Sequence, residues 1–189
     1  MSAAQVRDLY AGRYRDWNEL RPGPSVPVRV VGRGGESGSR RTFEQTMLVG
    51  ASQGELTSDS CVTADRGVPG SRVVRCERGS EDLIVDEVAT IPGAIGYVDL
   101  ASANAATAGR LPVTVQRLDG RYPDVSAAAT GYPLWTIEYL YTKGEPEDGT
   151  VLAALTEYLR GDTAYAELVE AGYTPCATDD RPYPLCDDQ

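Results

Sequence analysis

Histidine is absent from all 189 residues of the sequence. This absence excludes Ser-His-Asp and Cys-His catalytic systems, and it excludes every metal site that relies on an imidazole ligand. Long apolar runs are missing too, since no stretch approaches the roughly 20 consecutive apolar residues of a membrane-spanning helix. Residues 1–5 contain no basic segment followed by an apolar core, so we expect no signal peptide and no direct insertion into a membrane.

Positive charge is scarce relative to negative charge. The sequence has 18 Lys and Arg residues against 28 Asp and Glu residues, which gives a formal net charge of −10. Nucleic acids and anionic membrane surfaces both favour basic patches, so we expect neither as a partner. The overall field also repels anionic ligands, so any affinity for an anion has to come from local hydrogen bonds. With 41% hydrophobic residues and this length, the sequence predicts one domain over residues 1–189.

The four cysteines form two pairs that are close in the sequence, Cys61 with Cys76 and Cys176 with Cys186. Four cysteines allow three connectivities, of which proximity favours the local one. No spacing has the form C-x-x-C, so we predict neither a zinc site nor a redox dithiol. Two disulfides, each contributing about 2–3 kcal/mol, suit a piece of a longer exported protein. The second pair would close a tail over residues 174–189; four reduced cysteines in a cytosolic protein are the alternative.

One glycine-rich stretch, residues 28–45, gives the strongest local pattern. Its first valines predict a buried strand, and its four glycines permit positive φ and a close approach of the backbone to a ligand. Either Ser37 or Ser39 is placed to cap the helix that follows, whose inner face would carry Phe43 and Met47. A helix start behind such a loop favours an anion, and Arg33 adds a guanidinium that can grip two oxygens. The alternative is a surface turn without a ligand.

Strand and helix patterns alternate along the rest of the chain. The capping box of residues 2–5 predicts a helix at the start of the chain. We expect strands over residues 72–76, 94–98, 111–118 and 136–141. We expect further helices over residues 80–89, 101–108 and 151–159, and a last helix that ends at Gly172. Residues 50–70 look like a long loop held by a disulfide. The alternation indicates an α/β domain with an open mixed sheet flanked by helices. Ligands of such sheets bind at the carboxyl ends of the strands, where residues 33–39 would lie.

The sequence does not predict an enzyme. No pair of carboxylates lies in a motif that would act as general acid and general base. Ser37 is followed by glycine but does not lie in a nucleophile elbow, and no histidine is available to activate it. We therefore expect a binding function, with no cofactor, no metal and no catalytic residues.

In the stretches described above, among them residues 28–45 and 94–98, the sequence resembles the second lobe of type 2 periplasmic solute-binding proteins of phosphate ABC transporters. Five blocks follow the order found in that family: residues 8–12 with 17–18, 30–39, 92–97, 132–134 and 171–173. The block Pro-Gly-Ala-Ile-Gly-Tyr at residues 92–97 and the pattern Arg-x-x-x-Ser-Gly-Ser at residues 33–39 are specific in combination. The resemblance spans most of the chain.

The resemblance implies that phosphate or a similar oxyanion is bound by the residues that match the family pattern Arg-x-Asp-Gly-Ser-Gly-Thr, namely Arg33, Ser37, Gly38 and Ser39. Gly35 stands where the family has aspartate, Glu36 where it has glycine, and Ser39 where it has threonine. Ser39 keeps the hydroxyl, but the carboxylate that would steady the arginine is lost. Glu36 is a substitute for that carboxylate, a charge that repels the anion, or a solvated loop residue.

The family has two lobes, and the sequence matches only the second. The resemblance therefore implies a first lobe supplied by upstream sequence or by another chain, an ABC-transporter permease as a partner, and an extracellular or cell-surface location. Because a half-site offers about half of the hydrogen bonds, we expect weak phosphate binding by the isolated chain. The alternative function is a sensor or protein-interaction domain that keeps the lobe fold but has lost transport.

Overall fold

The computed structural model describes residues 1–176 and residue 186. The chain divides into two compact units, Met1–Trp135 and Thr136–Gln189, and each is described by itself. The single domain over residues 1–189 stays a prediction. In the described part of the chain, no helix has both the length and the apolar composition that a membrane span requires.

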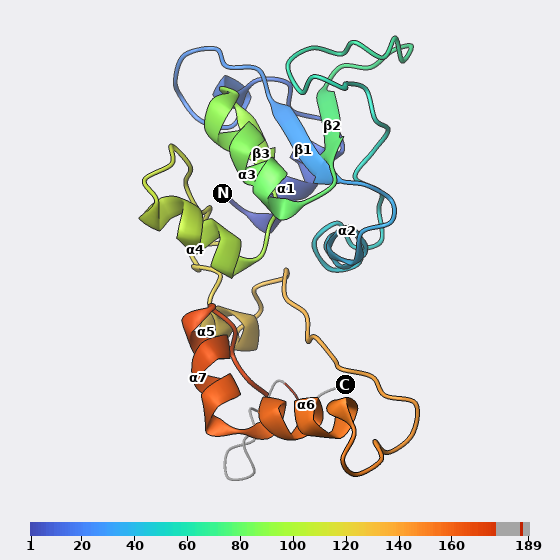
Figure 1. Cartoon of the computed structure of the whole chain (residues 1–189). Coiled ribbons are helices and arrows are strands. Elements are labelled where there is room, and N and C mark those ends of the chain that lie inside the picture. Colours follow the sequence, from blue (N-terminus) through green and yellow to red (C-terminus); the bar gives the residue numbers. More distant parts are fainter. Residues whose placement is uncertain (177–185, 187–189) are drawn as a thin grey trace. The chain divides into compact units, whose positions relative to one another are not determined.

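The first unit is built around a three-stranded parallel sheet in the order β2-β1-β3. The central strand is β1 (Arg29–Arg33), which pairs with β2 (Val74–Arg78) on one side and with β3 (Ala94–Gly96) on the other. Helices flank this open sheet, as Figure 1 shows. The α/β class and the open sheet are confirmed.

Both faces of the sheet are covered by apolar side chains. Successive residues of a strand point to opposite faces, and Val30 and Val31 of β1 accordingly belong to different cores. Val30 lies in the core that receives α1 (Ala3–Tyr10), whereas Val31 packs with Ile84 of α3 (Glu81–Thr90). The central strand is therefore buried between helices, which fixes the position of its carboxyl end.

The helices of this unit begin where the sequence offers a side-chain oxygen to the first backbone N–H groups. The capping side chains are Ser2 for α1, Ser37 for α2 (Gly38–Thr42), Ser80 for α3, Asp99 for α4 (Leu100–Ala108) and Asp124 for α5 (Val125–Ala129). The capping box of α1 is complete, because Gln5 also accepts the N–H of Ser2. The helices predicted at 80–89 and 101–108 are confirmed.

Helix α2 continues without a break into the π-helical segment η2 (Phe43–Met47). Phe43 and Met47 are both buried, as the spacing predicts. The Phe43 ring stacks on Tyr97 with 4.0 Å between centroids and lies 4.7 Å from the Tyr10 ring. This aromatic group holds η2 against α1 and against Tyr97, which follows β3.

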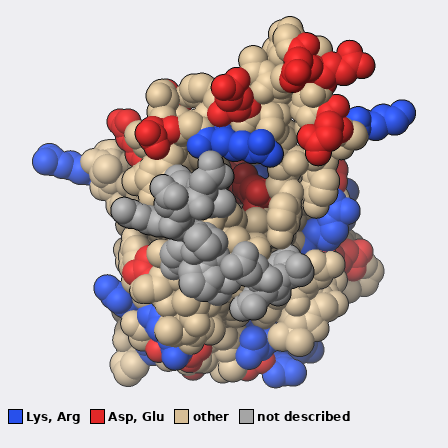
Figure 2. Space-filling model, turned by 90° about the horizontal axis from the view of Figure 1, so that it is seen from below, with Lys and Arg blue, Asp and Glu red and all other residues tan. Residues whose placement is uncertain are grey.

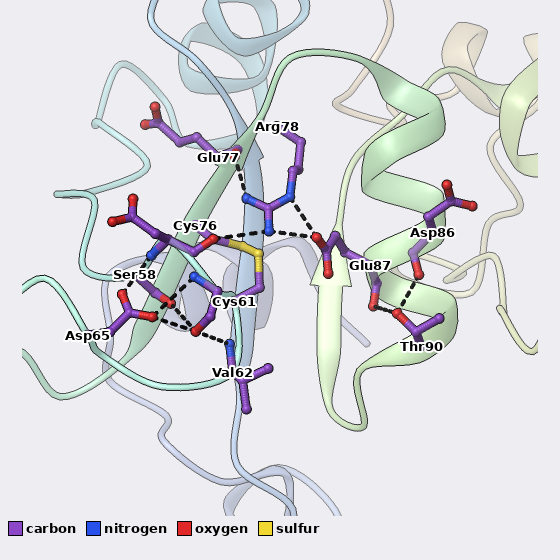
Figure 3. A network of polar contacts seen from close by, with 12 residues as sticks. Ser58, Cys61, Val62, Asp65, Cys76, Glu77, Arg78, Asp86, Glu87 and Thr90 are labelled. Atoms are coloured by element: carbon purple, nitrogen blue, oxygen red, sulfur yellow. Dashed lines mark hydrogen bonds and ion pairs between the residues drawn. A yellow bond between two sulfur atoms is a disulfide. The ribbon is translucent and has the colours of Figure 1, made fainter.

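The segment between η2 and β2 is a long loop tied to the sheet by the Cys61–Cys76 disulfide, as predicted. Figure 3 shows this bridge next to Arg78, whose guanidinium pairs with Glu87 of α3. Buried Thr57 adds a second tie, because its hydroxyl donates to the carbonyl of Val73 at 2.9 Å. The loop is held by covalent and polar contacts rather than by apolar packing.

The second unit contains α6 (Val151–Arg160), α7 (Asp162–Glu170) and the Cys176–Cys186 disulfide. Both helices and the local pairing of all four cysteines are confirmed. Apolar residues of α6 stay partly exposed, with Val151 at 86% and Leu155 at 43%. Of the tail predicted over 174–189, residues 177–185 and 187–189 lie outside the described residues.

Two strand predictions are wrong. Residues 111–118 and 136–141 alternate in hydrophobicity but form no strand, and the first segment makes only one isolated bridge, from Leu118 to Arg121. A strand requires a neighbour that completes its hydrogen-bond ladder, and no described segment provides one here. Tyr139, Leu140 and Tyr141 are all more than half exposed. Alternation of apolar and polar residues shows which side chains would share a face of a strand, but it does not show whether a neighbouring strand is present to pair with it.

Gly96 of β3 provides a test of the packing between the sheet and α3. A Cβ atom at this position would lie 2.5 Å from Cγ2 of Ile84 and 3.1 Å from the carbonyl oxygen of Val31. We expect Gly96→Ala to lower the free energy of unfolding by about 1–3 kcal/mol, measured by urea denaturation. Gly35→Ala is the control, since a Cβ there meets nothing within 4 Å. Equal stability of the two variants would contradict this packing.

Candidate functional site

The loop of residues 33–39 lies at the carboxyl end of the central strand, as the sequence predicts. Arg33 is the last residue of β1, and a turn closed by the bond from Ser37 N–H to the Gly34 carbonyl, at 3.1 Å, leads into α2. Ser37, rather than Ser39, is the cap of α2, because its hydroxyl oxygen accepts the N–H of Arg40. The structure thus brings the four predicted site residues together around one turn.

Of the four glycines in this stretch, Gly32, Gly34, Gly35 and Gly38, none has a positive φ. The positive φ that glycine permits is therefore not used at these four positions. Gly32 is needed for space instead, since a Cβ would lie 2.5 Å from the Gln53 side-chain oxygen. The close approach that the sequence pattern indicates is made by a side chain of the protein itself.

The guanidinium of Arg33 is held beside the turn between β2 and α3. Its Nη2 donates to the carbonyl of Gly79 at 2.9 Å, and its Nη1 lies 3.6 Å from Oε1 of Glu81. Its Nε is buried and has no hydrogen-bond partner among the described residues. The side chain is 16% exposed, so the charge is largely desolvated but still reaches the surface.

Glu81 contacts two residues of the candidate site, and the sequence patterns did not single it out. Its Oε1 accepts the Ser39 hydroxyl at 3.0 Å and faces Arg33, while its Oε2 accepts the N–H of Asp99 at 2.8 Å. Burial raises the pKa of Glu81, and the nearby Asp99 carboxylate adds to this, although the bonds from Asp99 N–H and Ser39 oppose the rise. The carboxylate therefore joins two of the predicted ligand residues.

A signal for Glu81 is present in the sequence only indirectly. It is the first residue of α3, directly after a strand that pairs in parallel with β1, so its side chain starts from the same edge of the sheet as Arg33. That placement becomes visible only when the strand order is known. Glu36, in contrast, is exposed and has no hydrogen bond or ion pair among the described residues. This position matches the solvated alternative for Glu36.

The backbone of Arg33 is fixed by side chains from three other segments. Its N–H donates to the Tyr97 hydroxyl at 3.2 Å, and its carbonyl accepts from Gln53 Nε2 at 2.9 Å and from Arg40 Nη1 at 3.2 Å. The Tyr97 hydroxyl in turn donates to Gln53 Oε1 at 2.9 Å. Burial raises the pKa of Tyr97 to about 12, so this hydroxyl keeps its proton at neutral pH.

Arg40 and Glu44 complete the support beneath the loop. Arg40 pairs with Glu77 of β2 at 2.8 Å and with Glu44 at 3.1 Å. Burial acts to raise the pKa of Glu44, but hydrogen bonds from Gln53 N–H and from Arg40 outweigh it and lower this pKa. Two carboxylates thus pair with Arg40, whereas Arg33 faces one carboxylate, that of Glu81.

Charge of one sign does not gather on the face that Figure 2 shows. Lys and Arg side chains are interspersed there with Asp and Glu side chains. Nucleic-acid interfaces instead collect basic residues on one face. With a net charge of −10, an anion at the Arg33 turn would have to be held by local donors rather than by the overall field.

Comparison with known proteins places the chain among periplasmic-binding-protein relatives. A family model described as a PBP superfamily domain matches residues 1–162. The phosphate-binding protein PstS of Bacillus subtilis (strain 168) is 30% identical to the chain over 179 residues. This match covers 93% of the chain and 50% of that protein, so the chain spans about half the length of its curated relative.

Three solved structures have the same fold. They are a phosphate ABC transporter substrate-binding protein with bound phosphate from Clostridium perfringens (TM-score 0.55, 17% identity), an ABC-type phosphate transport receptor from Vibrio cholerae (0.54, 19%) and PstS from Borrelia burgdorferi (0.54, 14%). In the same order, the match covers 60%, 64% and 62% of the length of each solved structure. It covers 90%, 93% and 91% of the present chain. The resemblance noted in the sequence, and its restriction to part of the relatives, is confirmed.

Tyr97→Phe tests the support of the Arg33 backbone. The change leaves the partly buried Arg33 N–H and the Gln53 side-chain oxygen without their shared partner. We expect the free energy of unfolding to fall by about 1–3 kcal/mol and the Arg33 amide to exchange faster with solvent. The control is Tyr141→Phe, because that ring is 83% exposed. Unchanged exchange at Arg33 in the Tyr97 variant would contradict the proposed support.

Glu44→Gln tests the partly exposed charge beneath the loop. A carboxyl group whose pKa is lower in the folded state stabilises the fold above its unfolded pKa, near 4.5, and loses this contribution as the pH falls through the folded pKa. We therefore expect the wild type to be more stable than the variant at neutral pH and the gap to close in acid. The difference in urea midpoint between wild type and variant, followed from about pH 7 to pH 3, measures this effect, with the exposed Glu55→Gln as the control. A stability difference that does not change with pH would contradict the lowered pKa of Glu44.

Proposed function

Because the chain belongs to the PBP superfamily, we propose that it is the phosphate-binding lobe of an extracytoplasmic solute-binding protein of an ABC transporter. The anion is held at the turn of residues 33–39 by Arg33, Ser37, Gly38 and Ser39. This is a binding function without a catalytic step. The named relatives are phosphate-binding and phosphate-transport proteins, which does not favour a sensor or interaction domain.

The observation that carries the proposal is the placement of Arg33. Its guanidinium lies at the carboxyl end of a central parallel strand, the edge at which open α/β sheets bind ligands. Its Nε is buried without a protein partner among the described residues, and the Ser39 hydroxyl shares Glu81 with it. A desolvated guanidinium with a donor to spare and a neighbouring hydroxyl is suited to an oxyanion.

The turn supplies further donors with little rearrangement. The Ser37 hydroxyl accepts the Arg40 N–H and keeps its own proton for donation. The backbone of Gly38, the first residue of α2, adds an N–H group at the start of the helix. These donors counter the unfavourable field of an acidic protein by contact at short range.

The half-length match supports a binding site completed by a first lobe, contributed by further sequence or by another chain. A permease of an ABC transporter would be the partner that receives the ligand, and an extracellular or cell-surface location would suit the two disulfides. With one face of the anion uncovered, we expect a dissociation constant for phosphate of about 1 mM or weaker.

Phosphate titration of the isolated chain by amide NMR tests this function, because chemical shifts report weak binding residue by residue. We expect phosphate to shift the amide signals of residues 33–39 at low salt. Arg33→Ala should weaken the response about tenfold or more, since it removes a charged hydrogen-bond donor. Arg41→Ala is the matched control, because Arg41 lies on α2, the helix that follows the turn, and is exposed.

The outcomes separate local binding from general electrostatics. Equal weakening by both arginine substitutions would show that phosphate responds to net charge, which contradicts a site at Arg33. Shifts that appear only outside residues 33–39 would place the anion elsewhere. A submillimolar dissociation constant for the isolated chain would contradict the half-site.

A further inference from the structure

We propose that a small cavity beneath the loop between η2 and β2 binds one internal water molecule, which joins Arg75 of β2 to the side chains that fix the Arg33 carbonyl. The cavity has a volume of about 10 Å³ and is lined by residues of β1, β2 and the loop. Gln53, Gly54, Arg75 and Glu77 are the lining residues that decide its chemistry. The inference concerns the support of the turn and does not depend on the proposed function.

Arg75 carries a donor that no group in the described part of the chain uses. Its Nε is buried and has no hydrogen-bond partner there. Its Nη2 donates to the carbonyl of Tyr10 at the end of α1, and none of the ion pairs between described residues includes Arg75. Burial lowers the pKa of Arg75, because a guanidinium taken out of water without a carboxylate is poorly solvated. This side chain therefore favours a polar neighbour such as a water molecule.

Two glycines leave space beside this donor. Gly32 of β1 pairs with Glu77, so it lies on the face of the sheet that carries both Arg75 and Glu77. Gly54 has a φ of +99°, and a Cβ there would lie 2.7 Å from Nε of Arg75. The loop backbone thus passes directly against the guanidinium, and a small shift of the guanidinium brings Nε to a water in the cavity. A volume of about 10 Å³ matches a single water molecule.

Glu77 provides the acceptor for this water. Its Oε1 accepts from Nη1 of Arg40 at 2.8 Å and from Nε2 of Gln53 at 3.3 Å. Its Oε2 takes part in no hydrogen bond or ion pair between described residues. A water that accepts from Nε of Arg75 and donates to Oε2 of Glu77 has two polar partners, which is within the range found for internal waters.

The water extends the support of the Arg33 carbonyl to a second part of the fold. Gln53 donates to that carbonyl at 2.9 Å and also to Glu77, so both side chains belong to the same group of bonds. Arg75 is bonded to the end of α1. Through the water, α1 and the loop are connected to the strand end that carries the turn, and the charge of Arg75 is solvated.

Magnetisation transfer from water in the wild-type chain tests this site by NMR. We expect cross-peaks from water to the Nε–H of Arg75 and to the N–H of Gly54 that have opposite signs in laboratory-frame and rotating-frame experiments, which is the signature of a long-lived bound water. Arg72 is the control in the same sample, because it is exposed just before β2 and should show only exchange with bulk water. The absence of bound-water cross-peaks at both Arg75 and Gly54 would overturn the proposal.

Arg75→Met tests whether the guanidinium holds the water. The change keeps an unbranched side chain and removes the buried donor, so we expect the bound-water cross-peak at the Gly54 N–H to be lost. Arg72→Met removes an exposed guanidinium and should keep this cross-peak. A cross-peak that persists at Gly54 in the Arg75 variant would overturn the role of Arg75. If that variant does not fold, the signals of the wild-type chain decide.

A titration of the wild-type chain with sodium chloride distinguishes water from a halide ion. Chloride is larger than water and would also lie against the Glu77 carboxylate, so we expect the Nε–H signal of Arg75 to move no more than that of exposed Arg72. A saturable shift confined to Arg75 and Gly54 would place chloride in the cavity and overturn the assignment to water.

Discussion

The hydrogen bonds on the peptide groups of Arg33 are the constraint on which the site depends. They come from Tyr97 after β3, from Gln53 in the long loop and from Arg40 in α2. Three separate segments are thereby fixed at one strand end. Because buried polar groups are costly when unpaired, these bonds act together, and the loop keeps one geometry only while all three segments stay in place.

Apolar packing places the charges of the site. Glu81 and Ile84 are three residues apart on α3 and therefore lie on neighbouring positions of the helix surface. Ile84 packs against Val31 in the core, and Gly96 leaves room for its side chain. The distance between the Glu81 carboxylate and Arg33 is thus set by how closely α3 approaches the sheet. The placement of the charged side chains therefore depends on the packing of the core as much as on their own hydrogen bonds.

The parts of the structure that depend on neighbouring residues could be predicted from the sequence. Capped helices such as α1 and α3, the strand before the glycines, and the local disulfides belong to this group. The strands expected at 111–118 and 136–141 are absent, because a strand needs a pairing partner elsewhere in the chain and the local pattern does not show whether one exists. Glu81 was missed for the same reason: its proximity to Arg33 follows from the order of the strands, which the sequence pattern leaves open.

The Cys61–Cys76 bridge ties the loop that also carries Gln53. Cys76 sits in β2 directly opposite Val31 of the central strand, so the bridge anchors the loop at the middle of the sheet. While both thiols are reduced, that anchor is missing, and Gln53 has less to hold it under the Arg33 carbonyl. Oxidation would therefore act as a late reinforcing step in maturation: a reduced chain keeps the Thr57 tie to the sheet, and closing the bridge adds a covalent hold on the same loop.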